Sequence, residues 1–179
     1  RVMSTQPIEV GWTVASLLRR VATAVPPLRA LIDTGALITG LSNREVAQHL
    51  LEYGLAGWCE GVVFLDESDE KVILVKATGR VLKLSQCGIS VDKRFAFFDH
   101  IHCTGMDIKM GLAAQAALTL GKDMVFRDLA QGAFRMRGIG KGQKIVLFVV
   151  PEVWRLVTAQ VSLGSGEPAE QRQQRLAVL

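Results

Sequence analysis

Helical spacing of apolar residues predicts two helices in the first third of the chain. Residues 12–24, "WTVASLLRRVATA", place apolar side chains at helical spacing, and a Pro-Pro pair ends the pattern. The second helix, "SNREVAQHLLEYG", begins with Ser42 and Glu45 at the spacing of a capping box, and its final glycine supplies a C-cap. Between the two, "LRALIDTGALITGL" is typical of a short helix, a turn at Gly35 and a buried strand that begins near Ala36.

The hydrophobic period changes from helical to alternating after Gly57. The runs "GVVFLD", "KVILVK" and "RVLKLS" are three short strands separated by "ESDE" and "ATG", which predicts a small antiparallel β meander over about residues 61–84. The carboxylates of "DESDE" lack the glycine and the distal glutamate of a calcium loop, so we expect a polar hairpin turn there.

Apolar strands alternate with helices in the second half of the chain. "RFAFFD" at residues 94–99, "AAQAALTLG" ending at Gly121 and "KIVLFVV" ending before Pro151 have the apolar character of strands that are buried on both faces. We expect Asp123 to cap a helix through "MVFRDLAQGAFRMR" and Pro151 to begin a last helix, "PEVWRLVTAQ". This alternation predicts an α/β fold in which helices flank a parallel sheet.

Length and charge narrow the class of protein. The 179 residues suffice for one domain that buries a core without a disulfide or a metal, and we divide them into a leading helical segment (1–30), a lobe with the meander (31–160) and a polar tail (161–179). The net charge of +4 is not gathered into the Lys/Arg stripe of a nucleic-acid binder, and no run reaches the ~20 apolar residues of a membrane helix. Because the chain begins with Arg1, we expect it to be a piece of a longer protein.

Three cysteines without a CxxC spacing indicate buried thiols in a reducing, intracellular compartment, either the cytoplasm or the nucleus. They also argue against a disulfide framework and a zinc ribbon.

The densest group of reactive side chains lies in "FFDHIHCTGMDIK". Cys103 is a candidate nucleophile, with His100 or His102 as its base and Asp99 beside them. If the strand continues through this run, the two histidines share one face while Cys103 and Asp99 share the other, so the run does not form a self-contained dyad. A zinc site that adds Cys87 matches no ligand spacing, and we predict no metal site.

A second candidate site combines "TGMDIK" with "QGAFRMRGIGKGQ". Gln131 and Arg135 are four residues apart and would share one helical face, while Arg137 and Lys141 follow near the helix end and its glycine turn. An arginine held at a helix end can bind a phosphate bidentately, as an arginine finger does. A Gly-x-Asp loop on the neighbouring strand can pass a change at that phosphate on to a substrate.

These two segments resemble motifs V and VI of superfamily-2 helicase-like ATPases. They are similar to the second RecA-like lobe of the preprotein-translocase motor ATPase. A longer series of blocks over roughly residues 30–155, from "ALIDTGALITGLSNREVA" to "FRMRGIGKGQ", resembles a segment of very large eukaryotic proteins of unknown function. In those proteins the segment follows an upstream phosphate loop, and some members carry a ubiquitin-hydrolase label.

The resemblance implies a role for individual residues. The positions that match the motif V loop are Gly105, Asp107 and Lys109, and those that match motif VI are Gln131 and Arg135. Arg137 stands one residue early for the second arginine of motif VI. Two further positions depart from the family pattern, with Met106 in place of Thr and Phe134 in place of Gly. "GIGKG" lacks the spacing of a Walker loop, so this chain alone is not expected to bind or hydrolyse ATP.

The resemblance therefore implies the C-terminal motor lobe of a helicase- or translocase-like ATPase. In the parent protein, ATP and Mg²⁺ would be held by an upstream phosphate-loop lobe, and Arg135, with Arg137, would complete the site. The substrate that is moved, whether nucleic acid or polypeptide, stays open, and no membrane partner is expected. Two alternatives remain: a ubiquitin-type thiol hydrolase that uses Cys103 with His100 or His102, and a catalytically degenerate lobe that serves as a scaffold in a large assembly.

Overall fold

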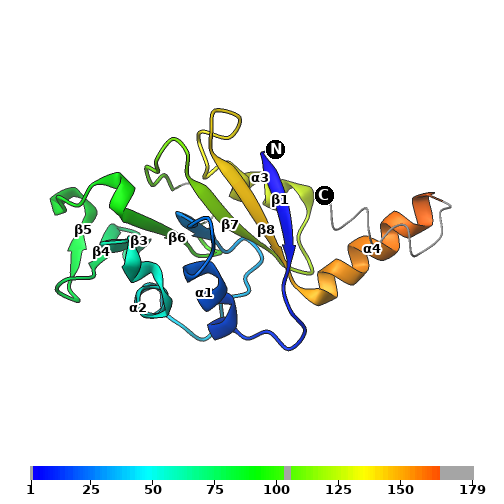
Figure 1. Cartoon of the computed structure of the whole chain (residues 1–179), viewed down its shortest axis with the longest axis horizontal. Helices are drawn as coiled ribbons and strands as arrows, with labels where there is room; N and C mark the ends of the chain where they lie inside the picture. The colour runs from blue at the N-terminus through cyan, green and yellow to red at the C-terminus, as the bar shows by residue number, and fades with distance from the viewer. Residues whose placement is uncertain (1, 103–105, 166–179) are drawn as a thin grey trace.

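A computed structural model of the chain describes residues 2–102 and 106–165. They form one eight-stranded sheet with the strand order β1-β8-β7-β2-β6-β3-β4-β5 (Figure 1). The strands are β1 (Met3–Pro7), β2 (Ala30–Ile32), β3 (Gly61–Leu65), β4 (Lys71–Val75), β5 (Val81–Lys83), β6 (Arg94–Phe98), β7 (Gln115–Leu120) and β8 (Lys144–Val149). The helices are α1 (Val14–Ala22), α2 (Asn43–Tyr53), α3 (Phe126–Ala133) and α4 (Pro151–Ser165), with 3-10 turns η1 (Leu55–Gly57), η2 (Leu84–Gln86) and η3 (Val91–Lys93).

The strands from β1 to β3 in this order are parallel, and β4 and β5 continue the sheet antiparallel beyond β3. The predicted α/β fold and the antiparallel meander are thus both confirmed. The meander is not a separate unit, because β3 also pairs in parallel with β6.

Two crossover connections run in opposite directions along the sheet. The connection through α2 leads from β2 toward β3, whereas the connection through α3 leads from β7 toward β8. Since such crossovers are right-handed, the two helices lie on opposite faces, with α1 beside α2 (Figure 1). The strand order therefore switches direction between β2 and β7, and in parallel sheets the carboxyl ends of the strands at such a point border a crevice.

Backbone contact is very close at this switch point. A Cβ atom on Gly35 would lie 2.5 Å from the backbone nitrogen of Gly121, and a Cβ on Gly121 would lie 2.4 Å from the carbonyl oxygen of Gly35. The buried carboxylate of Asp33 accepts a hydrogen bond from the Thr119 hydroxyl at 2.7 Å, and the same hydroxyl accepts one from the Gly35 N–H at 2.9 Å. The carboxyl ends of β2 and β7 are thus joined directly.

The hydrophobic core follows from strands that are apolar on both faces. All residues of β2 and β3 are buried, as are four of the five residues of β6, and most of their side chains belong to one hydrophobic cluster that also contains the buried residues of α1 and α2. The predicted capping box of α2 is present, because the Glu45 carboxylate accepts the Ser42 N–H at 2.7 Å and the Ser42 hydroxyl accepts the Glu45 N–H at 3.2 Å. Gly54 ends this helix, as predicted.

Three predictions about elements are wrong. The buried strand near Gly35 precedes that turn as β2, since "ALI" pairs with β6 and β7, and no strand begins at Ala36. Helix α3 is shorter than expected, with Val125 at its N-cap in place of Asp123 and its last residue at Ala133. The leading segment was expected to be helical, but it also holds β1, which pairs with β8 along the whole strand.

Among residues 2–102 and 106–165, none of the helices combines the length and the hydropathy that a membrane span requires. Helix α4 leaves the sheet at the end of β8 and extends away from it (Figure 1).

Candidate functional site

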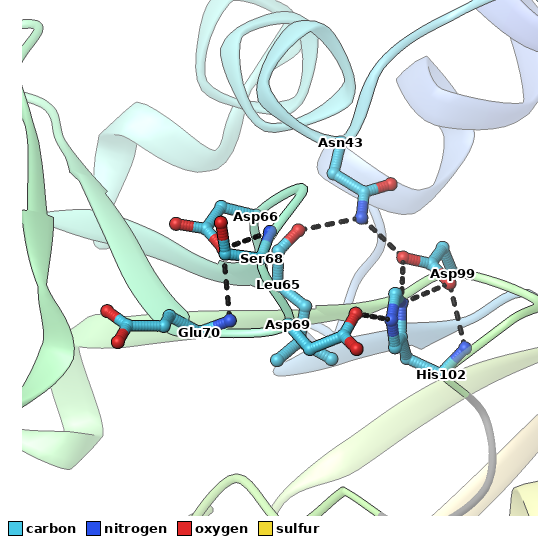
Figure 2. A network of polar contacts seen from close by, with 8 residues as sticks. All are labelled: Asn43, Leu65, Asp66, Ser68, Asp69, Glu70, Asp99 and His102. Carbon is cyan, nitrogen blue, oxygen red and sulfur yellow. Dashed lines mark hydrogen bonds and ion pairs between the residues drawn. The ribbon is translucent and has the colours of Figure 1, made fainter.

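A polar network lies at the carboxyl ends of β3 and β6. The strand β6 ends at Phe98, and the chain then turns so that His102 folds back onto Asp99. The backbone N–H of His102 donates to Oδ1 of Asp99 at 2.9 Å, and its ring Nδ1 lies 2.7 Å from Oδ2 of the same carboxylate (Figure 2). The predicted alternation of faces through this run is therefore wrong, because the strand ends before it.

Two residues from distant parts of the chain complete the network. Asp69, in the turn between β3 and β4, places Oδ1 2.7 Å from Nε2 of His102. That turn is shaped by Asp66, whose Oδ1 accepts the N–H groups of Ser68 and Glu70 at 2.9 and 3.0 Å (Figure 2). Asn43, the first residue of α2, donates through Nδ2 to Oδ2 of Asp99 and also to the Leu65 carbonyl, the latter at 2.9 Å.

The His102 ring faces a carboxylate at each nitrogen, so both nitrogens must carry a proton to donate. Burial disfavours this charged form, but the hydrogen bonds to Asp99 and Asp69 outweigh burial and raise the pKa of His102 above its ordinary value. Burial likewise opposes ionisation of Asp99, yet the hydrogen bonds from His102 and Asn43 prevail and lower the pKa of Asp99. Each member of the pair therefore favours the charged form of the other, an imidazolium beside a carboxylate.

This arrangement does not suit a thiol site. A histidine that acts as a general base needs one nitrogen free to accept a proton, and the two ring nitrogens of His102 are held by Asp99 and Asp69. Cys103 lies outside the described residues, and His100 is exposed. Among the predicted thiol residues, the structure thus brings Asp99 and His102 together in a contact that stabilises the fold.

A second junction brings the segment after Met106 against the segment after α3. Nε of Arg137 lies 3.5 Å from Oδ1 of Asp107, thirty positions away in the sequence, and both side chains are more than half exposed. Arg135 is 7% exposed, and its Nη1 donates to the backbone carbonyl of Met106. The two segments that resemble motifs V and VI are therefore in contact through both arginines.

The two side-chain contacts described at this junction do not include the remaining residues predicted for the site. Arg135 follows the end of α3, so it does not share a helical face with Gln131. The side chains of Lys109, Gln131 and Lys141 are exposed, and Gly105 lies outside the described residues.

Two members of the His102 network were missed by sequence reasoning. Asn43 and Asp69 are separated from Asp99 and His102 by 56 and 33 positions, respectively. The sequence indicated them only by their position: Asn43 begins a predicted helix, and Asp69 lies in a predicted turn that follows a buried strand. Parallel strands gather such positions at one edge of a sheet.

The described cysteines are both free thiols. Cys59 is buried and donates through Sγ to the Gly61 carbonyl at 3.1 Å, and burial raises the pKa of its thiol to about 11. Cys87 is a partly buried free thiol. Within residues 2–102 and 106–165, no group of three or more His, Cys, Asp and Glu side chains is arranged to hold a metal ion.

Comparison of the chain with protein-family models, with curated proteins and with solved structures gave no match. Inference about function therefore depends on the geometry of the two sites.

Proposed function

We propose that the chain is the second lobe of a helicase- or translocase-like ATPase. The observation that carries the proposal is the junction between residues 106–107 and residues 135–137. An ATPase lobe of this kind needs a cation near the phosphate and a loop that senses it, and here Arg137 and Asp107 are paired while the neighbouring Arg135 holds Met106.

The two arginines have different surroundings, and we assign them different roles. Arg137 is exposed, and its pair with Asp107 is of the exposed kind that contributes only ~0–1 kcal/mol to stability. A phosphate can therefore replace the Asp107 carboxylate as the partner of Arg137 with little loss of stability, and it can form a bidentate hydrogen bond with the guanidinium. Arg137 is accordingly the residue that would contact the phosphate.

Arg135 is the positioning residue in this proposal. Its buried guanidinium links the end of α3 to the carbonyl of Met106, directly before Asp107. A shift of Arg137 toward a phosphate would be passed through this link to the 106–109 loop, and from there to whatever substrate the protein moves.

ATP and Mg²⁺ would be bound chiefly by another lobe of the parent protein, since this chain contains no Walker spacing. The exposed guanidinium of Arg137 fits the phosphate end of the nucleotide. Bound there, ATP supplies a phosphoryl group whose developing negative charge an arginine can stabilise. The chain on its own should not hydrolyse ATP.

The test is ATP hydrolysis by the longest natural protein that contains this segment, compared with its Arg137→Ala variant. We expect a loss of turnover by about 10³-fold or more, the range found for arginine fingers. Lys122→Ala, which removes an exposed cation outside both candidate sites, is the matched control and should retain turnover. Equal turnover in the parent and in Arg137→Ala would refute the assigned role, and no turnover in any form would refute the motor function.

A further inference from the structure

A cavity of about 220 Å³ shares no lining residue with the His102 network, and its lining includes Lys109 of the 106–109 loop. It opens between the loop that leads into β6 and the segment that leads into β7. Its floor and walls include the buried side chains of Val63, Ala96 and Ile108. The volume far exceeds the ~10–15 Å³ that one water needs and approaches the ~300 Å³ of small ligand sites.

Charged side chains surround this apolar floor. Arg29, Arg94 and Lys109 are cationic and Asp92 is anionic, so two positive charges are in excess. Within the described part of the chain, none of the three cations forms an ion pair. An apolar cavity with an unbalanced positive charge favours an anion that also carries an apolar group.

Both arginines are held in place by main-chain carbonyls. Arg94 donates through Nε to the Ile89 carbonyl at 2.7 Å and through Nη2 to the Cys87 carbonyl at 3.4 Å. Arg29 donates through Nη1 to the Asp92 carbonyl at 2.9 Å, and its guanidinium lies over the Trp58 ring. A guanidinium has five N–H groups, so each arginine keeps donors beyond these bonds. The cations are thus ordered before any ligand arrives, which lowers the entropic cost of binding.

We propose that this cavity binds a carboxylate that carries a small apolar group, such as the C-terminal residue of a polypeptide or a free acid of the same shape. The carboxylate would be paired with Lys109 and the free donors of the arginines, and the apolar group would lie on Val63, Ala96 and Ile108. The cavity is too small for a nucleotide. Ile108 and Lys109 belong to the 106–109 loop, but the proposal is tested separately from the ATPase function, because its probes and variants involve neither Arg137 nor Asp107.

Binding of N-acetyl-leucine and of N-acetyl-leucinamide to the full chain, measured by calorimetry at neutral pH and low salt, tests the proposal. The two probes share the apolar group and differ only in the carboxylate. We expect saturable binding of the acid, at least tenfold weaker binding of the amide and a decrease of affinity with salt. Equal binding of both probes, or saturable binding of neither, would overturn the proposal, as would equally tight binding of inorganic phosphate.

Two variants and a control locate the binding. A Cβ at Gly111 would contact only Asp92 Oδ1, at 3.5 Å, so Gly111→Val should fold, as its melting temperature would verify, and should abolish binding by filling the cavity. Lys109→Gln should weaken binding of the acid about two- to fivefold, the range of an exposed charge pair, whereas Lys122→Gln, outside the cavity, should not. Unchanged binding in folded Gly111→Val would place the probe elsewhere and overturn the proposal.

The source of the carboxylate is distinguished by a third probe, a hexapeptide that ends in leucine with a free C-terminus. Binding at least as tight as that of N-acetyl-leucine would identify a polypeptide terminus as the ligand. Loss of binding with the longer chain would identify a free acid, and both results support the carboxylate site.

Discussion

Nε of Arg137 lies 3.5 Å from Oδ1 of Asp107, although thirty positions separate the two residues in the sequence. The contact lies in the open, since 58% of the Arg137 side chain and 55% of the Asp107 side chain are exposed. Two residues earlier, the side chain of Arg135 is buried against the same loop. Residues 135–137 thus contain one exposed arginine that can bind a partner, Arg137, and one buried arginine that contacts the 106–107 loop, Arg135.

Arg135→Ala should lower the free energy of unfolding by roughly 2–3 kcal/mol, because it removes a buried charged hydrogen bond to the Met106 carbonyl and the packing of the arginine stem. Arg137→Ala, which removes an exposed pair, should change it by less than about 1 kcal/mol. Urea denaturation of both variants measures the difference. Equal stability of the two variants would contradict the positioning role of Arg135.

His102 should titrate above its ordinary pKa of 6.5, because the bonds to Asp99 and Asp69 favour the imidazolium. Its contribution to stability is then fully present below pH 6.5 and is lost as pH rises through the raised folded pKa. The lowered pKa of Asp99 acts in the opposite sense, so its contribution is present above pH 3.8 and is lost as pH falls through the folded value.

An NMR titration of the imidazole resonances measures this pKa directly. Asp99→Asn should lower the pKa of His102 more than Asp69→Asn does, because the Asp99 side chain is 13% exposed and that of Asp69 is 70% exposed. A midpoint for His102 below 6.5 in the unaltered chain would disprove the doubly paired imidazolium.

Gly121→Ala should destabilise the fold by roughly 1–3 kcal/mol or more, because its Cβ would lie 2.4 Å from the Gly35 carbonyl oxygen and the strand ends must separate. Gly88→Ala is the matched control, since a Cβ there meets nothing within 4 Å, and its effect should stay within about 0.5 kcal/mol. Thermal unfolding compares the two. A Gly121→Ala protein as stable as the control would show that the close approach of β2 and β7 is not needed.

Cys103 should form no adduct with an electrophilic ubiquitin probe, because the ring nitrogens of its neighbour His102 are engaged by Asp99 and Asp69. Intact mass spectrometry of the chain and of Cys103→Ser after treatment with the probe is the check. An adduct that forms in the unaltered chain and is lost in Cys103→Ser would contradict this prediction and support the thiol-hydrolase alternative.

Strands with a strong apolar signal could be predicted from the sequence, and weakly marked ones could not. The long apolar runs of β3, β6, β7 and β8 were identified at nearly their true bounds. β2 has only three residues, and β1, "MSTQP", is mostly exposed at the sheet edge, so neither carries a clear hydrophobic period. β1 is a strand because its backbone pairs with β8, and β2 is a strand because its backbone pairs with β7. Both partners are distant in the sequence.

The candidate sites were predicted in part for the same reason. The contact between Asp107 and Arg137 joins the two segments singled out by their glycines and arginines. By contrast, the burial of Arg135 depends on where α3 ends, and the pairing of His102 with Asp69 depends on the fold of a distant turn. Both features depend on parts of the chain that are distant in the sequence, so the pattern of neighbouring residues could not predict them.

The most direct measurement is a comparison of nucleotide affinity with turnover for Arg137→Ala in the longest natural protein that contains this segment. If Arg137 stabilises charge that develops on the transferred phosphoryl group, ATP hydrolysis should fall by about 10³-fold or more while the dissociation constant for ATP changes only a few-fold. Hydrolysis that is unchanged, or that falls only in proportion to a loss of ATP affinity, would contradict the motor-lobe assignment of this arginine.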